Sequence, residues 1–153
     1  MDPIDRKLLI EIQKDASRTT DELANLIGSS PSSVQRRLAR FKRDGTVTAD
    51  ISIVDPVMLG QSLSFVVGLV TDRKQSDLYA ALRDWVNSTD QVQQAYNVTG
   101  EMDFILIVTA PTMDAYDALM DRLIKQNPIV KKYITSAILQ TYKRGLFTPV
   151  PSD

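Results

Sequence analysis

The chain has 153 residues, of which 43% are hydrophobic and 24% are charged, and it contains neither cysteine nor histidine. These two absences exclude disulfides, Cys- or His-ligated metals and an imidazole base, and the sequence has no glycine-rich phosphate-binding motif. These absences leave catalysis by paired carboxylates, lysine or tyrosine open but disfavour an enzyme, so we expect no enzyme activity, no cofactor and no metal site. No apolar run is long enough to span a membrane and no signal segment leads the chain, which predicts a cytoplasmic protein with no membrane partner.

The net charge is −1, but the charges are unevenly distributed. Residues 1–45 contain nine Lys and Arg against seven Asp and Glu (+2), and the remaining residues contain nine against twelve (−3). Five positive charges and no negative one lie between residues 36 and 43. A local excess of this kind is typical of a surface that binds nucleic-acid phosphates.

Two helices are predicted before residue 28. The first spans residues 3–14, with Asp2 as its N-cap and apolar residues repeating every three or four positions. The second begins after Thr19, which forms a capping box with Glu22, and it ends at Gly28.

A third helix is predicted from Pro31 to Asp44, with Ser30 as its cap. Only a tight turn separates it from the second helix, which is the pattern of a helix-turn-helix. A helical projection places its apolar residues Val34, Leu38 and Phe41 on one face. The opposite face and its flanks carry the candidate DNA-binding residues: Ser32, Ser33, Gln35, Arg36, Arg37, Arg40 and Arg43.

Arginine and glutamine can bond to base edges in the major groove, and small serines near the helix start permit close approach. The competing interpretation is an amphipathic surface helix whose arginines are only solvated. The preceding helix, the short turn and the lack of acidic residues from 36 to 43 favour double-stranded DNA as the partner.

An extended β segment is predicted at residues 46–53, either as a small wing or as a strand that pairs with a second subunit. The Asp55-Pro56 pair marks a boundary, because a residue before proline is pushed out of helical geometry. The predicted organisation is a DNA-binding domain at residues 1–46, a β-strand linker at 47–60 and a second domain at 61–153.

The second domain alternates strands and helices in the order βαββαβ, which predicts a ferredoxin-like α+β fold. Strands are expected at residues 63–71, 91–98, 104–109 and 131–142, and helices at 76–87 and 113–126. Both helices then cover one face of an antiparallel sheet. The other face is also apolar, which predicts a homodimer through sheet packing; its residues are Val66, Val70, Ile105 and Ile107.

The loop between the second and third strands contains Gly100, which permits a positive φ or a close backbone approach. From spacing alone, an ordinary hairpin turn is the favoured explanation of this glycine. Asp103 is suited to bind an amino group, and the backbone N–H groups of the turn to bind a carboxylate.

The sequence resembles the Lrp/AsnC, or feast/famine, family of transcriptional regulators over nearly its whole length. The resemblance rests on residues 4–9 (IDRKLL), on residues 30–38 (SPSSVQRRL) followed by 44–45 (DG), and on residues 99–104 (TGEMDF). It implies a helix-turn-helix domain joined by a β-linker to a ferredoxin-like domain that binds a small effector and oligomerises.

By resemblance, family members form dimers and often octamers or other higher assemblies, and they bind a free amino acid between dimers. The positions that correspond to the effector site are Thr99, Gly100, Glu101, Met102 and Asp103. Thr135 and Ser136 stand where the family has small hydroxyl residues on the last strand, although ordinary strand residues explain them as well.

The sequence departs from the family pattern at two positions. Ser29 stands where a leucine is usual, and Met102 stands where an aromatic or small residue is common, which favours an apolar effector such as leucine or methionine.

Two rival functions remain to be compared. Siroheme decarboxylases resemble this family but are expected to depend on histidine, which this chain lacks. The alternative is a nucleoid-type architectural protein that binds DNA without an effector.

Overall fold

The computed structural model describes residues 1–72 and 78–151. The chain divides into two compact units. The first unit comprises residues 1–53 together with the segment after residue 142, and the second comprises residues 54–142.

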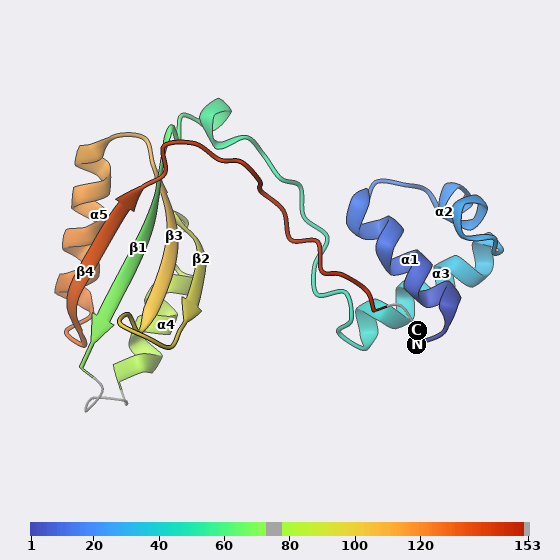
Figure 1. Ribbon diagram of the computed structural model, residues 1–153, viewed down its shortest axis with the longest axis horizontal. Helices are drawn as coiled ribbons and strands as arrows, with labels where there is room; N and C mark the ends of the chain where they lie inside the picture. The colour runs from blue at the N-terminus through green and yellow to red at the C-terminus, as the bar shows by residue number, and fades with distance from the viewer. Residues whose placement is uncertain (73–77, 152–153) are drawn as a thin grey trace. The chain divides into compact units, whose positions relative to one another are not determined.

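Three helices form the first unit: α1 (Pro3–Lys14), α2 (Thr20–Ile27) and α3 (Pro31–Arg43) (Figure 1). The predicted caps are present, because Asp2, Thr19 and Ser30 each accept a hydrogen bond from the backbone three residues ahead. Gly28 ends α2 in the left-handed conformation, with φ of 68°. The local sequence therefore determines where each helix begins and how the turn of the helix-turn-helix is made.

The core of this unit is formed by side chains from all three helices. Leu8 and Val34 are fully buried and Phe41 is nearly so, which confirms the predicted inner face of the third helix. On α2, Leu26 lies exposed, whereas Ala24 takes a core position beside Leu23 and Ile27.

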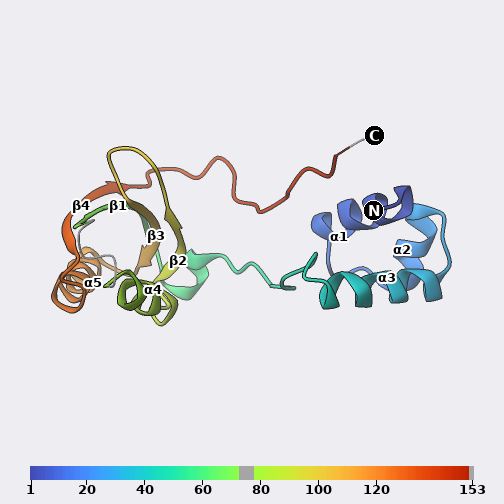
Figure 2. The ribbon, with the colours of Figure 1, turned by 90° about the horizontal axis from the view of Figure 1, so that it is seen from below.

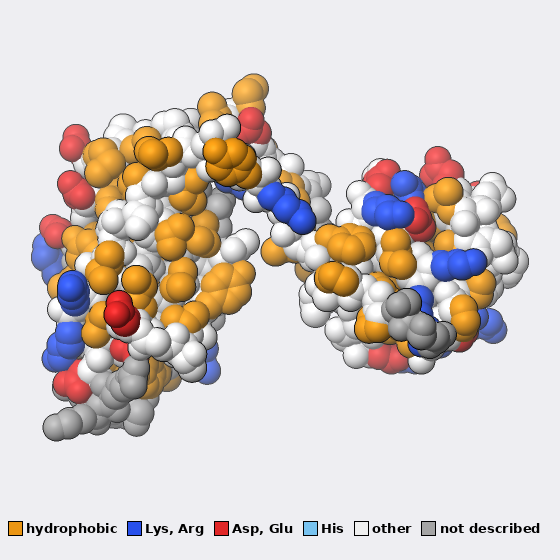
Figure 3. Space-filling model, in the orientation of Figure 1, with side chains coloured by type: hydrophobic (Ala, Val, Ile, Leu, Met, Phe, Trp, Pro, Cys, Tyr) orange, Lys and Arg blue, Asp and Glu red, His pale blue; other side chains and the backbone are white. Residues whose placement is uncertain are grey.

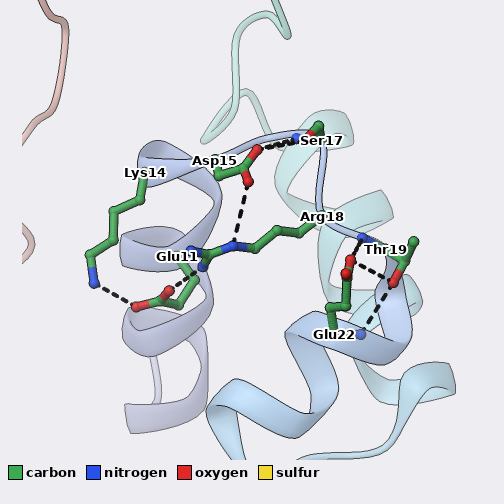
Figure 4. Close-up of polar contacts among 7 residues, drawn as sticks. All are labelled: Glu11, Lys14, Asp15, Ser17, Arg18, Thr19 and Glu22. Carbon is green, nitrogen blue, oxygen red and sulfur yellow. Dashed lines mark hydrogen bonds and ion pairs between the residues drawn. The ribbon is translucent and has the colours of Figure 1, made fainter.

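Ion pairs and caps fix the turn between α1 and α2 (Figure 4). Glu11 pairs with Lys14 at 2.6 Å and with Arg18. Asp15 accepts hydrogen bonds from both the backbone and the hydroxyl of Ser17. Hydrogen bonds from Lys14 and then Arg18 lower the pKa of Glu11, so these contacts are made by the ionised carboxylate.

The segment after α3 differs from the predicted strand. Among the described residues, none forms a strand ladder with residues 46–53, so the chain by itself builds no wing. Val47 packs against the helical core, and its N–H donates to the carbonyl of Phe41 at 3.0 Å. A short 3-10 helix, η1 (Pro56–Leu59), follows. The predicted β segment therefore has no partner strand among the described residues.

The second unit has the predicted ferredoxin-like order. Its elements are β1 (Leu63–Thr71), α4 (Tyr79–Asn87), β2 (Val92–Asn97), β3 (Phe104–Ala110), α5 (Met113–Gln126) and β4 (Val130–Ala137). The strands are antiparallel in the order β2-β3-β1-β4. Figure 2 shows α4 and α5 on the same side of the sheet.

Two element ends differ from the sequence prediction. The last strand was expected to reach residue 142, but β4 ends at Ala137 because its partner β1 begins at Leu63 and offers only one more hydrogen bond, from Ile138 to Ser64. The helix expected from residue 76 is observed as α4 from Tyr79, and residues 76 and 77 lie outside the described residues.

The two faces of the sheet differ in burial. Phe65, Val67 and Leu69 of β1 are buried against the helices, as predicted. The predicted open-face residues are only partly buried (Val66, Val70, Ile105 and Ile107), and Figure 3 shows hydrophobic side chains gathered over this face. We call these four residues the open face. No helix in the described part of the chain is long and apolar enough to cross a bilayer.

The C-terminal tail, residues 143–151, packs on the first unit, although the sequence assigned it to the second domain. The side-chain amide of Gln13 donates to the carbonyl of Thr148 at 3.2 Å and accepts from its N–H at 2.7 Å. Val150 packs against the core of the helical unit. The tail is thus held by a reciprocal hydrogen-bond pair and one apolar contact.

Candidate functional site

The outer face of α3 presents a mixture of polar and cationic side chains to solvent. Ser32, Gln35, Arg36 and Arg43 are exposed, and Ser33 is half-buried. Arg36 makes no ion pair among the residues that the structure describes, whereas Nε of Arg43 lies 3.1 Å from the carboxylate of the neighbouring Asp44. Four of the seven predicted DNA-binding residues therefore lie on an accessible surface.

Two predicted DNA-binding arginines are held by acids of α1. Arg37 contacts both Asp2, at 2.7 Å, and Asp5, and its side chain is only 17% exposed. Arg40 contacts the same oxygen of Asp5 at 2.6 Å and lies over the ring of Phe41, 5.1 Å from its centroid. The absence of acidic residues between positions 36 and 43 therefore did not mean an absence of acidic partners.

The ionisation states of this cluster follow from its contacts. Burial raises the pKa of Asp5, but the hydrogen bonds from Arg37, the Asp2 backbone and Arg40 outweigh it and leave that pKa below its ordinary value. The backbone hydrogen bond from Asp5, followed by the side-chain bond from Arg37, lowers the pKa of Asp2. The same acids, Asp2 and then Asp5, raise the pKa of Arg37. All three groups are charged at neutral pH.

In the second unit, the loop between β2 and β3 is closed by hydrogen bonds to Asp103. Its carbonyl accepts from the N–H of Val98 at 2.9 Å and from the amide of Asn97 at 3.0 Å. Gly100 has a φ of 123°, in the region that favours glycine. Of the two predicted reasons for a glycine here, the structure shows the positive φ, and a Cβ on Gly100 would meet no described residue within 4 Å apart from its chain neighbours.

The Asp103 side chain is buried within the fold rather than displayed on the turn. Its Oδ2 accepts from the N–H of Thr71 at 2.8 Å and from the Thr71 hydroxyl at 3.0 Å. The same hydroxyl lies 3.1 Å from the Tyr79 hydroxyl. Asp103 therefore ties the loop to the end of β1 and to the first turn of α4.

A cavity of about 720 Å³ lies between this loop and the start of α4. Three of the predicted effector residues line it: Thr99, Gly100 and Asp103. Sequence reasoning missed the α4 side of the wall, where Tyr79 and Arg83 lie four residues apart on one helix face. The four-residue spacing of these two side chains was the only sequence signal for them. It indicates a ligand site only once the fold has placed α4 beside the loop.

The other predicted effector residues do not line this cavity. Met102 folds over the open side of the sheet, where a Cβ on Gly68 would lie 1.9 Å from its Sδ. Thr135 pairs with Val67 and Ser136 with Val66, so the two lie on opposite faces of β4. The Thr135 hydroxyl bonds to Tyr116 of α5, and Glu101 is exposed. The chain by itself therefore does not bring these seven residues into one site.

Two domain families match this chain. Residues 1–42 match the AsnC-type helix-turn-helix domain, and residues 64–146 match the Lrp/AsnC ligand binding domain. The chain is 34% identical over 150 residues to the uncharacterized HTH-type transcriptional regulator y4tD of Sinorhizobium fredii, covering 98% of this chain and 89% of that protein. It is 28% identical over 145 residues to the leucine-responsive regulatory protein of Escherichia coli strain K12, covering 95% and 88%.

A solved structure shares the same fold. A transcriptional regulator from Neisseria meningitidis, in complex with L-Met, superposes with a TM-score of 0.90 at 23% identity, covering 97% of this chain and 96% of that one. The three capped helices match the DNA-binding domain and the βαββαβ unit matches the ligand-binding domain. The chain belongs to the Lrp/AsnC family of transcriptional regulators.

Proposed function

We propose that this regulator reads a specific DNA sequence with the outer face of α3. The observation that carries the proposal is the exposed group Ser32, Gln35 and Arg36, in which Arg36 has no ion-pair partner among the described residues. An unpaired guanidinium can bond a guanine edge bidentately, and a glutamine can bond an adenine edge. Arg43 lies at the far end of the helix, where a phosphate contact is the natural role.

The second part of the proposal is that the cavity beside the β2–β3 loop takes a free amino acid. Its volume lies within the range of small-molecule sites. Arg83 supplies a cation for the carboxylate, and Asp103, whose carboxylate is already bonded to Thr71, adds negative charge to the cavity lining on the side of the ammonium group. The name of the Escherichia coli relative and the L-Met bound to the Neisseria regulator support this class of effector.

The third part concerns assembly. The open face is apolar and only partly buried in the single chain, and a face of this kind seeks a partner. A homodimer through this face supplies two copies of α3 for two half-sites of DNA. The dimers then associate into octamers or other higher assemblies, as dimers of family members do. An effector that favours one assembly over another then changes DNA affinity by linkage.

The domain boundaries near residues 46 and 60 are part of the proposal, with the segment between them as a linker that pairs across the dimer. The regulator acts in the cytoplasm, needs no cofactor beyond its effector and catalyses no reaction.

A nucleoid-type architectural role is the alternative. That alternative predicts that selection from a random DNA pool enriches no sequence.

A thermal-shift screen against free amino acids tests the effector proposal, because a ligand that binds only the folded state raises the melting temperature. We expect one or a few amino acids to shift the wild type and to lose that shift in Arg83→Ala. Arg83 is 72% exposed and, among the described residues, pairs with its neighbour Asp84 alone, at 3.6 Å, so we expect its removal to leave the fold intact. Arg122→Ala, on the exposed side of α5, is the matched control. A shift retained in Arg83→Ala would place the effector elsewhere.

A further inference from the structure

The arginines of α3 fall into two groups that the sequence does not separate. Arg36 is exposed and has no ion-pair partner in the described part of the chain, whereas Arg37, the next residue, is 83% covered and contacts two acids of α1. Nε of Arg37 also lies 3.4 Å from the hydroxyl of Ser33, one turn earlier on its own helix. The Arg37 guanidinium is therefore held from three sides within the protein.

Asp5 connects the two helices through its two carboxylate oxygens. Its Oδ2 accepts from the N–H of Asp2 at 3.2 Å, which completes the capping box at the start of α1. Its Oδ1 accepts from Arg37 and, at 2.6 Å, from Arg40. One carboxylate, 4% exposed, thus caps α1 and binds α3. We call Asp2, Asp5, Arg37 and Arg40 the inter-helix ion cluster.

Arg37 is poorly placed to leave this cluster for DNA. If it turned outward to a phosphate, Asp2 would lose its arginine and the buried Asp5 would keep only Arg40, and an under-compensated buried charge is costly. Arginine suits the internal role, since its fixed set of N–H donors can serve Asp2, Asp5 and Ser33 together.

We propose that Arg37 is a positioning residue for DNA recognition: paired with Asp5, it fixes how α3 lies on α1 and so how Gln35 and Arg36 meet the groove, without contacting DNA itself. This inference rests on the proposed reading role of α3. It assigns to Arg37 and Asp5 a part in sequence selectivity that acts through Gln35 and Arg36.

The test uses the full chain and two DNA probes, a duplex selected by the wild type from a random pool and its scrambled counterpart. The ratio of the two dissociation constants measures selectivity, and the slope of log affinity against log salt counts phosphate contacts. The variants are Arg37→Ala, Asp5→Asn, their double variant, and Arg36→Ala as the comparison for a reading residue. All are measured at a temperature where each is folded.

We expect Arg37→Ala to lower the selectivity ratio about fivefold or more while its salt slope stays that of the wild type. Asp5→Asn should lower the ratio to a similar extent, although the Asp5 side chain points to α3 and is not itself a candidate for contact with DNA. The double variant should be no less selective than Arg37→Ala alone, because both changes break the same contact. Arg37→Lys, which keeps a single cationic group, should recover part of the selectivity ratio that Arg37→Ala loses. This variant replaces Asp5→Asn in the test if Asp5→Asn fails to fold.

Three results would overturn the inference. A salt slope reduced by about one in Arg37→Ala would make Arg37 a phosphate contact. Normal selectivity in Asp5→Asn, or additive losses in the double variant, would make Arg37 a direct base reader. A lowered melting temperature with unchanged selectivity in Arg37→Ala would show that Arg37 is a purely structural residue. If Arg36→Ala binds both probes like the wild type, α3 is not the reader, and the proposed function fails together with this inference.

Discussion

At the residue scale, the inter-helix ion cluster decides which cations of α3 are available to a ligand. The sequence shows five positive charges between residues 36 and 43 with no acid among them. The acids that bind Arg37 and Arg40 come from α1, more than thirty residues earlier in the chain. A pattern within one helix cannot predict such partners, because they depend on how α1 packs against α3.

Replacing Asp5 by alanine should destabilise the helical unit by about 1–3 kcal/mol, because two arginines lose a buried acceptor and α1 loses half of its capping box. Urea unfolding followed by circular dichroism measures the loss. Asp50→Ala is the matched control, since Asp50 pairs with Lys42 at 2.6 Å but both side chains are more than half exposed. Equal effects of the two changes would show that the burial of Asp5 contributes nothing.

The stability of the helical unit should fall in acid. The pKa values of Asp2, Asp5, Glu11, Asp15 and Glu22 are all lowered in the fold. A carboxyl group with a lowered pKa stabilises the fold above its ordinary value, and this contribution is lost as the pH falls through the folded value.

The ordinary values are 4.5 for Glu and 3.8 for Asp, so we expect the melting temperature to drop as the pH falls below about 4.5 and to continue dropping below 3.8. Thermal melts followed across this range measure the effect. Asp5→Asn should flatten part of the dependence. A melting temperature that rises on acidification would contradict the assigned ion pairs.

At the element scale, the sequence predicts most of the fold because the determinants are local. Caps, the terminal Gly28 and apolar periodicity define α1, α2 and α3. Alternation of buried and less buried positions defines β1, and a stripe of four buried residues on one helix face defines α5. The predictions differ from the structure where an element needs a partner. The end of β4 depends on the length of β1, and residues 46–53 find no partner strand among the described residues.

Introducing a charge on the open face should dissociate the proposed dimer. Ile107 lies on β3 between Gln94 of β2 and Val66 of β1, so Ile107→Glu places a carboxylate at the centre of the apolar face. We expect a monomer by light scattering after size exclusion, because a buried unpaired charge is costly. Arg122→Glu, exposed on α5, should keep the wild-type mass. A dimeric Ile107→Glu variant would show that this face is not the interface.

At the scale of the whole molecule, the two units are joined by two chain connections. The chain leaves the helical unit after residue 53 and returns to it after residue 142. The returning tail is bound through Gln13, 135 residues away in sequence. Neither composition nor periodicity indicates such a contact, so the sequence placed the tail with the second domain.

Gln13→Ala should release the tail. Lys143 and Arg144 are exposed trypsin sites, and the reciprocal hydrogen bonds of Gln13 with Thr148 hold the segment that follows them. We expect tryptic cleavage there to be severalfold faster, measured by mass spectrometry of the intact chain. Gln93→Ala, exposed on β2, should cleave at the wild-type rate. Unchanged cleavage in Gln13→Ala would mean that Thr148 is not what restrains the tail.

The sequence located the two candidate sites but not their composition. It placed the candidate DNA-binding surface on α3 and the candidate effector loop around Gly100. It could not separate Arg36 from Arg37, nor add Tyr79 and Arg83 to the loop, because both depend on contacts between distant elements. Met102 and Ser136 were assigned by resemblance, and neither lines the cavity beside the loop in the single chain.

The most direct test of the account measures the affinity of the full chain for its selected duplex, with and without each free amino acid, by fluorescence anisotropy. The account predicts tight, salt-dependent binding that one or a few amino acids change severalfold, with the change lost in Arg83→Ala and the binding itself weakened in Arg36→Ala. Binding that no amino acid alters, and that Arg36→Ala leaves intact, would contradict both the reading face and the effector cavity.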